Sequence, residues 1–212
     1  MDTNTIKYEP RPFAITFAVV IGLELFPMTL PVMEPLYATG IIRALQAAFI
    51  VVSVFWFADK ARIAGLFPAG MKKGIIRGLI WSAGFGLAAA VIAAVLALAG
   101  LDPVGMIGIG LPSEKKRLVV FFLVAALLGP VAEELFFRGV VYGFLRRFGV
   151  IPALLGSSAV FVLAHSPAGI AFTHVVGALV FAAAYEYEKN IMVPVTIHVM
   201  GNLALFSTVL LR

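Results

Sequence analysis

Two adjacent carboxylates and an arginine interrupt an apolar segment in the second half of the chain. The motif GPVAEELFFRG places Glu133, Glu134 and Arg138 near the middle of the apolar run 118–145. Residues four apart in a helix lie on one face, so we expect Glu134 to pair with Arg138 and Glu133 to point toward other helices. Charged groups are costly in lipid, so a carboxylate there indicates a functional role. A candidate role is to take a proton from water. The alternative is a structural Glu–Arg clamp with Glu133 facing solvent.

The three histidines all follow this acidic pair and lie in or beside apolar runs: His165, His174 and His198. His198 and Asn202 are four apart in HVMGN and therefore share one helix face. An imidazole and a carboxamide aimed into one cavity could donate hydrogen bonds to a developing oxyanion. A single membrane histidine is more often a packing hydrogen bond, which is our interpretation of His174. Three polar clusters on consecutive apolar segments favour one shared site.

The chain contains no cysteine, which excludes a thiolate nucleophile, a thiolate metal site and a disulfide framework. Glu133, His165 and His198 have side chains that zinc accepts, so a zinc-dependent protease with the same residues is an alternative. No HExxH motif is present, and the zinc ligands would be the residues needed as base and oxyanion donor. We therefore expect neither a metal ion nor another cofactor.

The elements that must carry these residues are membrane helices. A composition of 62% hydrophobic and 13% charged residues, with a mean hydropathy of +1.05, excludes a water-soluble globule. A spanning helix needs about 20 apolar residues. The predicted fold is all-α: a single polytopic domain, 1–212, of about seven (six to eight) transmembrane helices enclosing an intramembrane cavity. The expected spans are 13–33, 36–58, 79–100, 118–145, 151–164, 170–185 and 191–211.

The distribution of basic residues predicts the orientation in the membrane. The side that holds the N-terminus collects Lys7, Arg11, Lys60, Arg62, Lys72, Lys73, Arg77, Arg146, Arg147 and Lys189. The other side collects Lys115, Lys116, Arg117 and Arg212. The positive-inside rule then predicts a cytoplasmic N-terminus. The expected location is the inner membrane of a prokaryotic cell. Topology and anionic headgroups account for the net charge of +5 better than nucleic-acid binding does, so no nucleic-acid partner is expected.

Three further expectations concern the first half of the chain. The polar, mixed-charge first twelve residues lack the features of a cleaved signal peptide. The segment 61–77 has the pattern of an interfacial amphipathic connector rather than of a span. Glu24 and Arg43 are expected to have structural roles, as an interhelical hydrogen bond or a snorkelling side chain.

The ordered motifs resemble those of the CAAX-protease and bacteriocin-processing family of intramembrane endopeptidases, also called the Rce1-like or glutamic-type group. The resemblance covers 118–211, the expected protease core. It rests on three motifs, EExxxR, FxxxH and HxxxN, whose positions here are Glu133, Glu134, Arg138, Phe161, His165, His198 and Asn202.

The resemblance implies a helix bundle whose catalytic cavity opens to the cytoplasm and to lipid. It implies that Glu133 and His165 activate water. It makes His198 and Asn202 the group that stabilises the tetrahedral intermediate, with Glu134 and Arg138 in support. The implied substrate is a membrane-associated or lipid-anchored peptide or protein. Two other classes stay open: a proton-relay transporter, against which no repeated halves are evident, and a non-catalytic scaffold, against which every motif residue is present.

Overall fold

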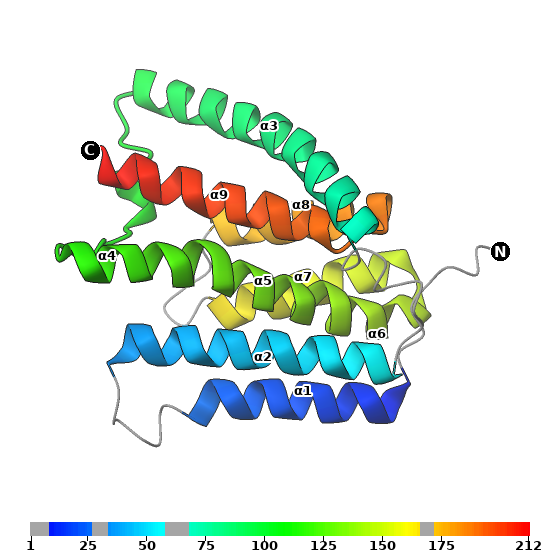
Figure 1. The fold of residues 1–212 in the computed structure, drawn as a ribbon. Helices are drawn as coiled ribbons and strands as arrows, with labels where there is room; N and C mark the ends of the chain where they lie inside the picture. The colour runs from blue at the N-terminus through cyan, green and yellow to red at the C-terminus, as the bar shows by residue number, and fades with distance from the viewer. Residues whose placement is uncertain (1–8, 27–33, 58–67, 166–171) are drawn as a thin grey trace.

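The computed structural model describes residues 9–26, 34–57, 68–165 and 172–212. Within these ranges seven helical segments run in alternating directions (Figure 1). They are α1 (Pro10–Leu25), α2 (Pro35–Phe57), α3 (Pro68–Leu98), the continuous helical rod Lys115–Phe148, α7 (Val150–His165), α8 (Phe172–Glu188) and α9 (Met192–Leu210). The described residues contain no strand, so the all-α prediction of about seven helices is confirmed.

Four of these segments are long and apolar enough to cross a membrane: Pro35–Val54, Ala69–Leu98, Lys115–Phe148 and Met192–Leu210. The other three, α1, α7 and α8, contain 16, 16 and 17 residues. On α3, large apolar side chains such as Leu87 and Leu98 are 68% and 89% exposed. Such exposure suits a surface that faces lipid tails. The fold is therefore a polytopic helical membrane bundle.

Residues 68–77, the described part of the predicted connector 61–77, belong to the third helix rather than to a separate connector. Helix α3 begins at Pro68, so Lys72, Lys73 and Arg77 lie in its first turns. Proline suits the start of a helix, because its fixed φ is helical and its missing N–H would have no partner there. Arg77 also donates to Glu188 of α8 at 2.6 Å, which ties this basic turn to the bundle. Residues 60–67, and 27–33 at the end of the first predicted span, lie outside the described residues.

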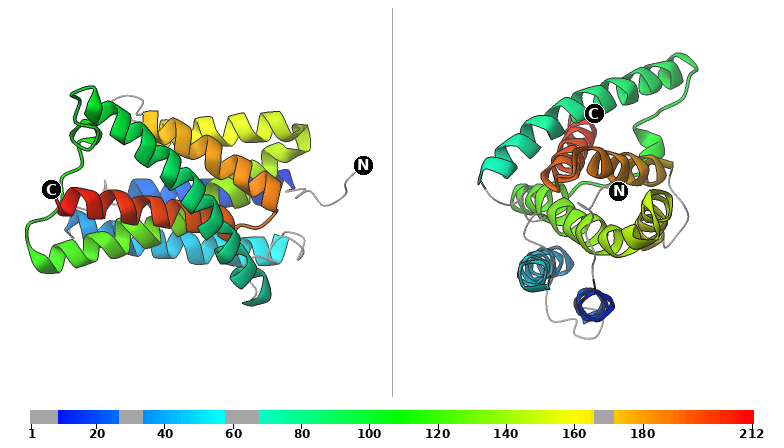
Figure 2. Two further views of the ribbon diagram at one scale, coloured as in Figure 1. Left: turned by 90° about the horizontal axis from the view of Figure 1, so that it is seen from above. Right: turned by 90° about the vertical axis from the view of Figure 1, so that its right-hand side faces the viewer.

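The rod Lys115–Phe148 lies at the centre of the bundle. In the end-on view of Figure 2 it runs between the α1–α2 pair and the α8–α9 pair, with α3 outermost beside α9. Its buried residues form the largest group in the apolar core: Leu135, Phe136, Phe137, Val140, Val141 and Tyr142. Close packing needs glycine at Gly40 of α2, where a Cβ would stand 2.8 Å from the Val124 side chain.

The rod is not a uniform α-helix. It consists of α4 (Lys115–Phe121), η5 (Phe122–Leu128), α5 (Gly129–Glu134), η6 (Leu135–Tyr142), α6 (Gly143–Leu145) and η7 (Arg146–Phe148). Both η5 and η6 are π-helical, so their backbone hydrogen bonds span five residues instead of four. These widened turns flank the short α5, which ends in the two glutamates. The acidic pair is thus held between two backbone irregularities.

Candidate active site

The expected ion pair between Glu134 and Arg138 is present and fully buried. Arg138 Nε lies 3.0 Å from Glu134 Oε2, and Nη1 lies 3.1 Å from Oε1, with both side chains 0% exposed. Arg138 Nη2 also donates to the Ala178 carbonyl at 3.0 Å. The guanidinium carbon lies 5.0 Å from the ring centroid of Phe161 and 5.4 Å from that of Phe181. A carboxylate, a carbonyl and aromatic faces thus compensate the buried cation.

Glu134 has a second partner that its spacing did not predict. His198 Nδ1 lies 2.9 Å from Glu134 Oε1. Because the carboxylate is paired with a guanidinium, it accepts, and Nδ1 therefore carries a proton. The ring stacks on Phe181 with centroids 4.7 Å apart. This hydrogen bond leaves Nε2 free to face Glu133, whose Oε2 is 3.9 Å away.

Glu133 contacts the second imidazole more closely. His165 Nε2 lies 3.3 Å from Glu133 Oε2. The other nitrogen, Nδ1, is 2.8 Å from the Phe161 carbonyl, which can only accept, so Nδ1 carries a proton. The ring of Phe161 stacks on His165 at 4.2 Å. Phe161 therefore fixes both the orientation and the tautomer of His165, with Nε2 directed toward Glu133.

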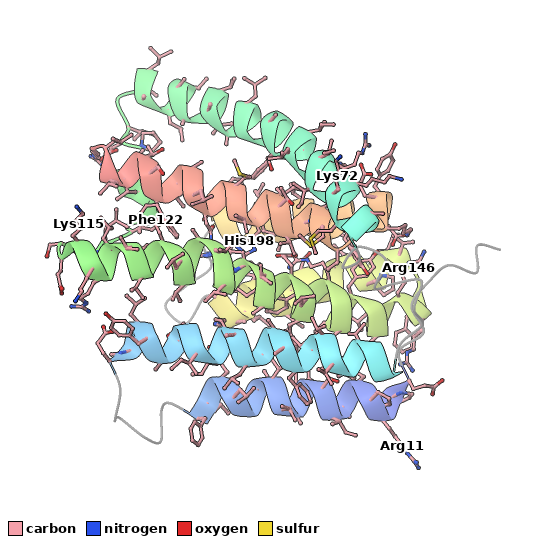
Figure 3. The ribbon with its side chains drawn as sticks, in the orientation of Figure 1. Arg11, Lys72, Lys115, Phe122, Arg146 and His198 are labelled. Carbon is pink, nitrogen blue, oxygen red and sulfur yellow. The ribbon has the colours of Figure 1, made fainter. Side chains whose placement is uncertain are left out.

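These contacts place Glu133 Oε2 between two imidazole nitrogens, 3.3 Å from His165 and 3.9 Å from His198. The side chains of Glu133 and His165 are 14% and 24% exposed, whereas Glu134 is 0% exposed. The Glu133–His165 pair is thus on the more open side of the site. Figure 3 shows His198 on α9 beside the rod, midway between the labelled Lys115 and Arg146 at the two ends of the bundle.

Asn202 lies one turn beyond His198 on α9, but its amide is turned toward the rod. Nδ2 donates to the carbonyl of Ala125 in η5 at 2.9 Å. One of the two N–H bonds of the amide is therefore committed to a backbone carbonyl. The other is the candidate for the oxyanion role that the motif implies.

Two residues interpreted as structural lie beside the site. His174 of α8 stacks on His165 with ring centroids 5.3 Å apart. Arg43 of α2 acts through its positive charge on both Glu133 and His165, and it donates to Glu24 at 2.6 and 3.1 Å. Sequence reasoning missed this proximity of Arg43, because no spacing rule links α2 to motifs about ninety residues later.

A metal site is not formed by the described side chains. Among them, no group of three or more His, Asp and Glu side chains is arranged to hold a metal ion. Glu134 is occupied by Arg138 and His198. The geometry instead provides proton donors and acceptors around one carboxylate oxygen.

The fold and the site together define a polytopic membrane protein with a buried glutamate–histidine centre. Residues 115–204 match the family model described as type II CAAX prenyl endopeptidase Rce1-like. The match covers the segment that carries the three motifs, so the family resemblance of these motifs is confirmed.

Two curated proteins illustrate the similarity. Over 94 residues the chain is 30% identical to the membrane-embedded CAAX protease MroQ of Staphylococcus aureus (strain USA300), covering 41% of this chain and 38% of MroQ. Over 143 residues it is 28% identical to YdiL of Bacillus subtilis (strain 168), which is named as a membrane peptidase, covering 63% of this chain and 57% of YdiL. The matched region thus spans between a third and three fifths of these relatives. No solved structure matches the chain.

Proposed function

We propose that this protein is an intramembrane endopeptidase that hydrolyses a peptide bond with a glutamate- and histidine-activated water. The observation that carries the proposal is the position of Glu133 Oε2 between the Nε2 atoms of His165 and His198. Peptide hydrolysis needs a base for water and donors for the oxyanion, and this arrangement offers both. The match of 115–204 to the Rce1-like family supports the same reaction class.

In the first step Glu133, held by His165, takes a proton from water while the water oxygen bonds to the scissile carbonyl carbon. The carbonyl π electrons move to oxygen and produce a tetrahedral oxyanion. His165 keeps its Nδ1–H on the Phe161 carbonyl throughout, so its Nε2 alone exchanges a proton with Glu133. In the second step the C–N bond breaks and the proton passes from Glu133 to the amine.

The oxyanion is stabilised from α9. His198 hydrogen-bonds through Nδ1 to Glu134 and stabilises the oxyanion through Nε2 when that nitrogen carries a proton, with the second N–H of Asn202 as another donor. Glu134 in turn is held by Arg138, whose Nε lies 3.0 Å from its Oε2. The ion pair therefore acts by orienting and polarising His198 rather than by contacting substrate.

The substrate class is a membrane-associated or lipid-anchored peptide or protein that reaches the site from the bilayer or its surface. We assign the protein to a bacterial inner membrane with the N-terminal side in the cytoplasm. Arg11, Lys72 and Arg146 lie at one end of the bundle and Lys115 at the other (Figure 3), in agreement with the positive-inside rule. Both curated relatives come from bacteria.

The test compares membranes that contain the wild-type chain with membranes that contain Glu133→Gln at equal abundance. Terminal-peptide proteomics is expected to find new termini only with the wild type, and these termini identify the scissile bond. Glu188→Gln, at the end of α8 and bonded to Arg77, is the matched control and should give the wild-type termini. Identical termini with Glu133→Gln would overturn the proposal.

A further inference from the structure

The carbonyl of Ala125 has lost its helical hydrogen-bond donor. In the π-helical turn η5 the N–H of Gly129 donates to the carbonyl of Val124, five residues earlier. The next donor in this pattern, five residues after Ala125, would be the N–H of residue 130. Residue 130 is proline, which has no N–H. The Ala125 carbonyl therefore needs a donor from another element, because water is scarce at this depth.

Asn202 supplies that donor from α9. Its Nδ2 lies 2.9 Å from the Ala125 oxygen across 77 residues of sequence. An unpaired carbonyl in an apolar environment costs about 1–3 kcal/mol. The contact therefore joins α9 to the rod at the Ala125 carbonyl, which has no helical donor because of the π turn and Pro130.

The same turn supports the carboxylate of Glu133. A Cβ placed on Gly129 would lie 3.1 Å from the Val124 carbonyl oxygen and 3.6 Å from Glu133 Oε1. The Glu133 side chain is thus close to the backbone of the π turn, and Pro130, less than 2% exposed, is fixed beneath it. A shift of this turn moves Glu133 relative to both histidines. Asn202, one turn from His198, therefore couples the two halves of the site.

We infer that Asn202 is a positioning residue, which replaces the donor that Pro130 removes and thereby holds Glu133 in register with His165 and His198. This role rests on the proposed hydrolytic function and is additional to any donation by its second N–H to the oxyanion. It predicts that the residue becomes less important when position 130 regains an N–H.

The experiment is a double-mutant cycle of Asn202→Ala and Pro130→Ala in the full chain. Asn202→Ala is expected to lose about 100-fold in kcat, the size of loss that a small misplacement of a catalytic group causes, with little change in KM. Pro130→Ala alone should stay within about tenfold of wild type, because a new N–H can bond to Ala125. The double variant should be at least about tenfold more active than Asn202→Ala and should recover its melting temperature.

If Asn202 acts only by stabilising the oxyanion, Pro130→Ala should not restore the activity of Asn202→Ala. A restored N–H at position 130 donates to Ala125 and cannot reach the substrate carbonyl, so the double variant would be as inactive as Asn202→Ala. That outcome would overturn the inference. Asn202→Leu fills the same space without an N–H and is measured in the same two backgrounds, which keeps the test decisive if the alanine variant does not fold.

Failure of the proposed function is detected separately. Glu133→Gln is included in every assay. The activities of the Asn202 variants are interpreted only if Glu133→Gln is inactive. If Glu133→Gln retains activity, the hydrolytic proposal fails, and the melting temperatures alone decide about Asn202. Recovery of thermal stability in the double variant would then still support the link through Ala125, and equal melting of the single and double variants would refute it.

Discussion

His198 donates its Nδ1–H to Glu134, which is 64 residues earlier in the chain, over 2.9 Å. This hydrogen bond connects the buried Glu134–Arg138 pair to the imidazole whose Nε2 faces Glu133. The two glutamates have different surroundings although they are adjacent. Glu133 faces the more open side and both Nε2 atoms, whereas Glu134 is fully buried and orients one of those rings.

The first prediction concerns the base. Glu133→Gln and His165→Ala should each lower cleavage by at least about 100-fold, the usual scale of general acid–base catalysis, while the protein stays folded and membrane-inserted. Cleavage is measured in detergent on a substrate identified by terminal proteomics, with Glu188→Gln as the control carboxylate. A Glu133→Gln activity within tenfold of wild type would rule out Glu133 as the base.

The second prediction separates stability from chemistry. Arg138→Ala leaves Glu134 as a buried and partly compensated anion, which costs about 3–5 kcal/mol for a broken buried pair. Its melting temperature in detergent should therefore fall well below that of Glu133→Gln, and its activity should be lost as well. Equal melting temperatures for the two variants would contradict the buried pair.

The third prediction tests the π turn beneath Glu133. In Gly129→Ala the new methyl group would crowd the Val124 carbonyl at 3.1 Å, so the turn or the Glu133 side chain must shift. We expect a loss of roughly 10- to 100-fold in kcat, since small displacements of catalytic groups have effects of that size. Gly84→Ala and Gly86→Ala are matched controls, because a Cβ there meets nothing within 4 Å. Equal activity of Gly129→Ala and these controls would refute the tight turn.

The fourth prediction is a pH dependence of stability at the end of α8. Burial raises the pKa of Glu186, but hydrogen bonds from Arg146, Lys189 and Tyr142 lower it by more. The net result is a pKa of about 2 instead of the usual 4.5. The ionised carboxylate thus stabilises the fold above pH 4.5, and this contribution is lost as the pH falls toward 2. The melting temperature of the wild type should drop across that window. Glu186→Gln should show a smaller drop, and an identical pH profile would count against the network.

Parts of the site followed from the sequence because they depend on local helix geometry. The Glu134–Arg138 pair and the shared face of His198 and Asn202 are consequences of four-residue spacing. The partner of Asn202 did not follow, because it depends on a π turn and on the missing N–H of Pro130.

For the fold, too, the sequence predicted the local elements but not the features that depend on packing. The apolar runs predicted seven helices, but the start of α3 was misplaced. The basic segment with Lys72 and Lys73 has the composition of a surface connector. It is part of a span because the helix is continuous from Pro68 and is bonded to α8 through Arg77. The charge of Arg43 near Glu133 likewise depends on how α2 packs against the rod.

The last prediction concerns a metal. A zinc enzyme binds stoichiometric metal, loses activity to strong chelators and recovers with added Zn²⁺, whereas a glutamate–histidine pair responds to none of these treatments. In this site the described side chains form no group of three or more arranged to hold a metal ion, and Glu133, His165 and His198 already have roles in the proposed hydrolysis. Both Nε2 atoms face a single carboxylate oxygen, which suits proton exchange. We therefore expect activity to survive prolonged phenanthroline treatment, and purified protein to carry well under one zinc per chain by elemental analysis. About one zinc per chain, lost together with activity in His165→Ala and His198→Ala, would replace the water-activating pair with a metal while leaving the peptidase proposal intact.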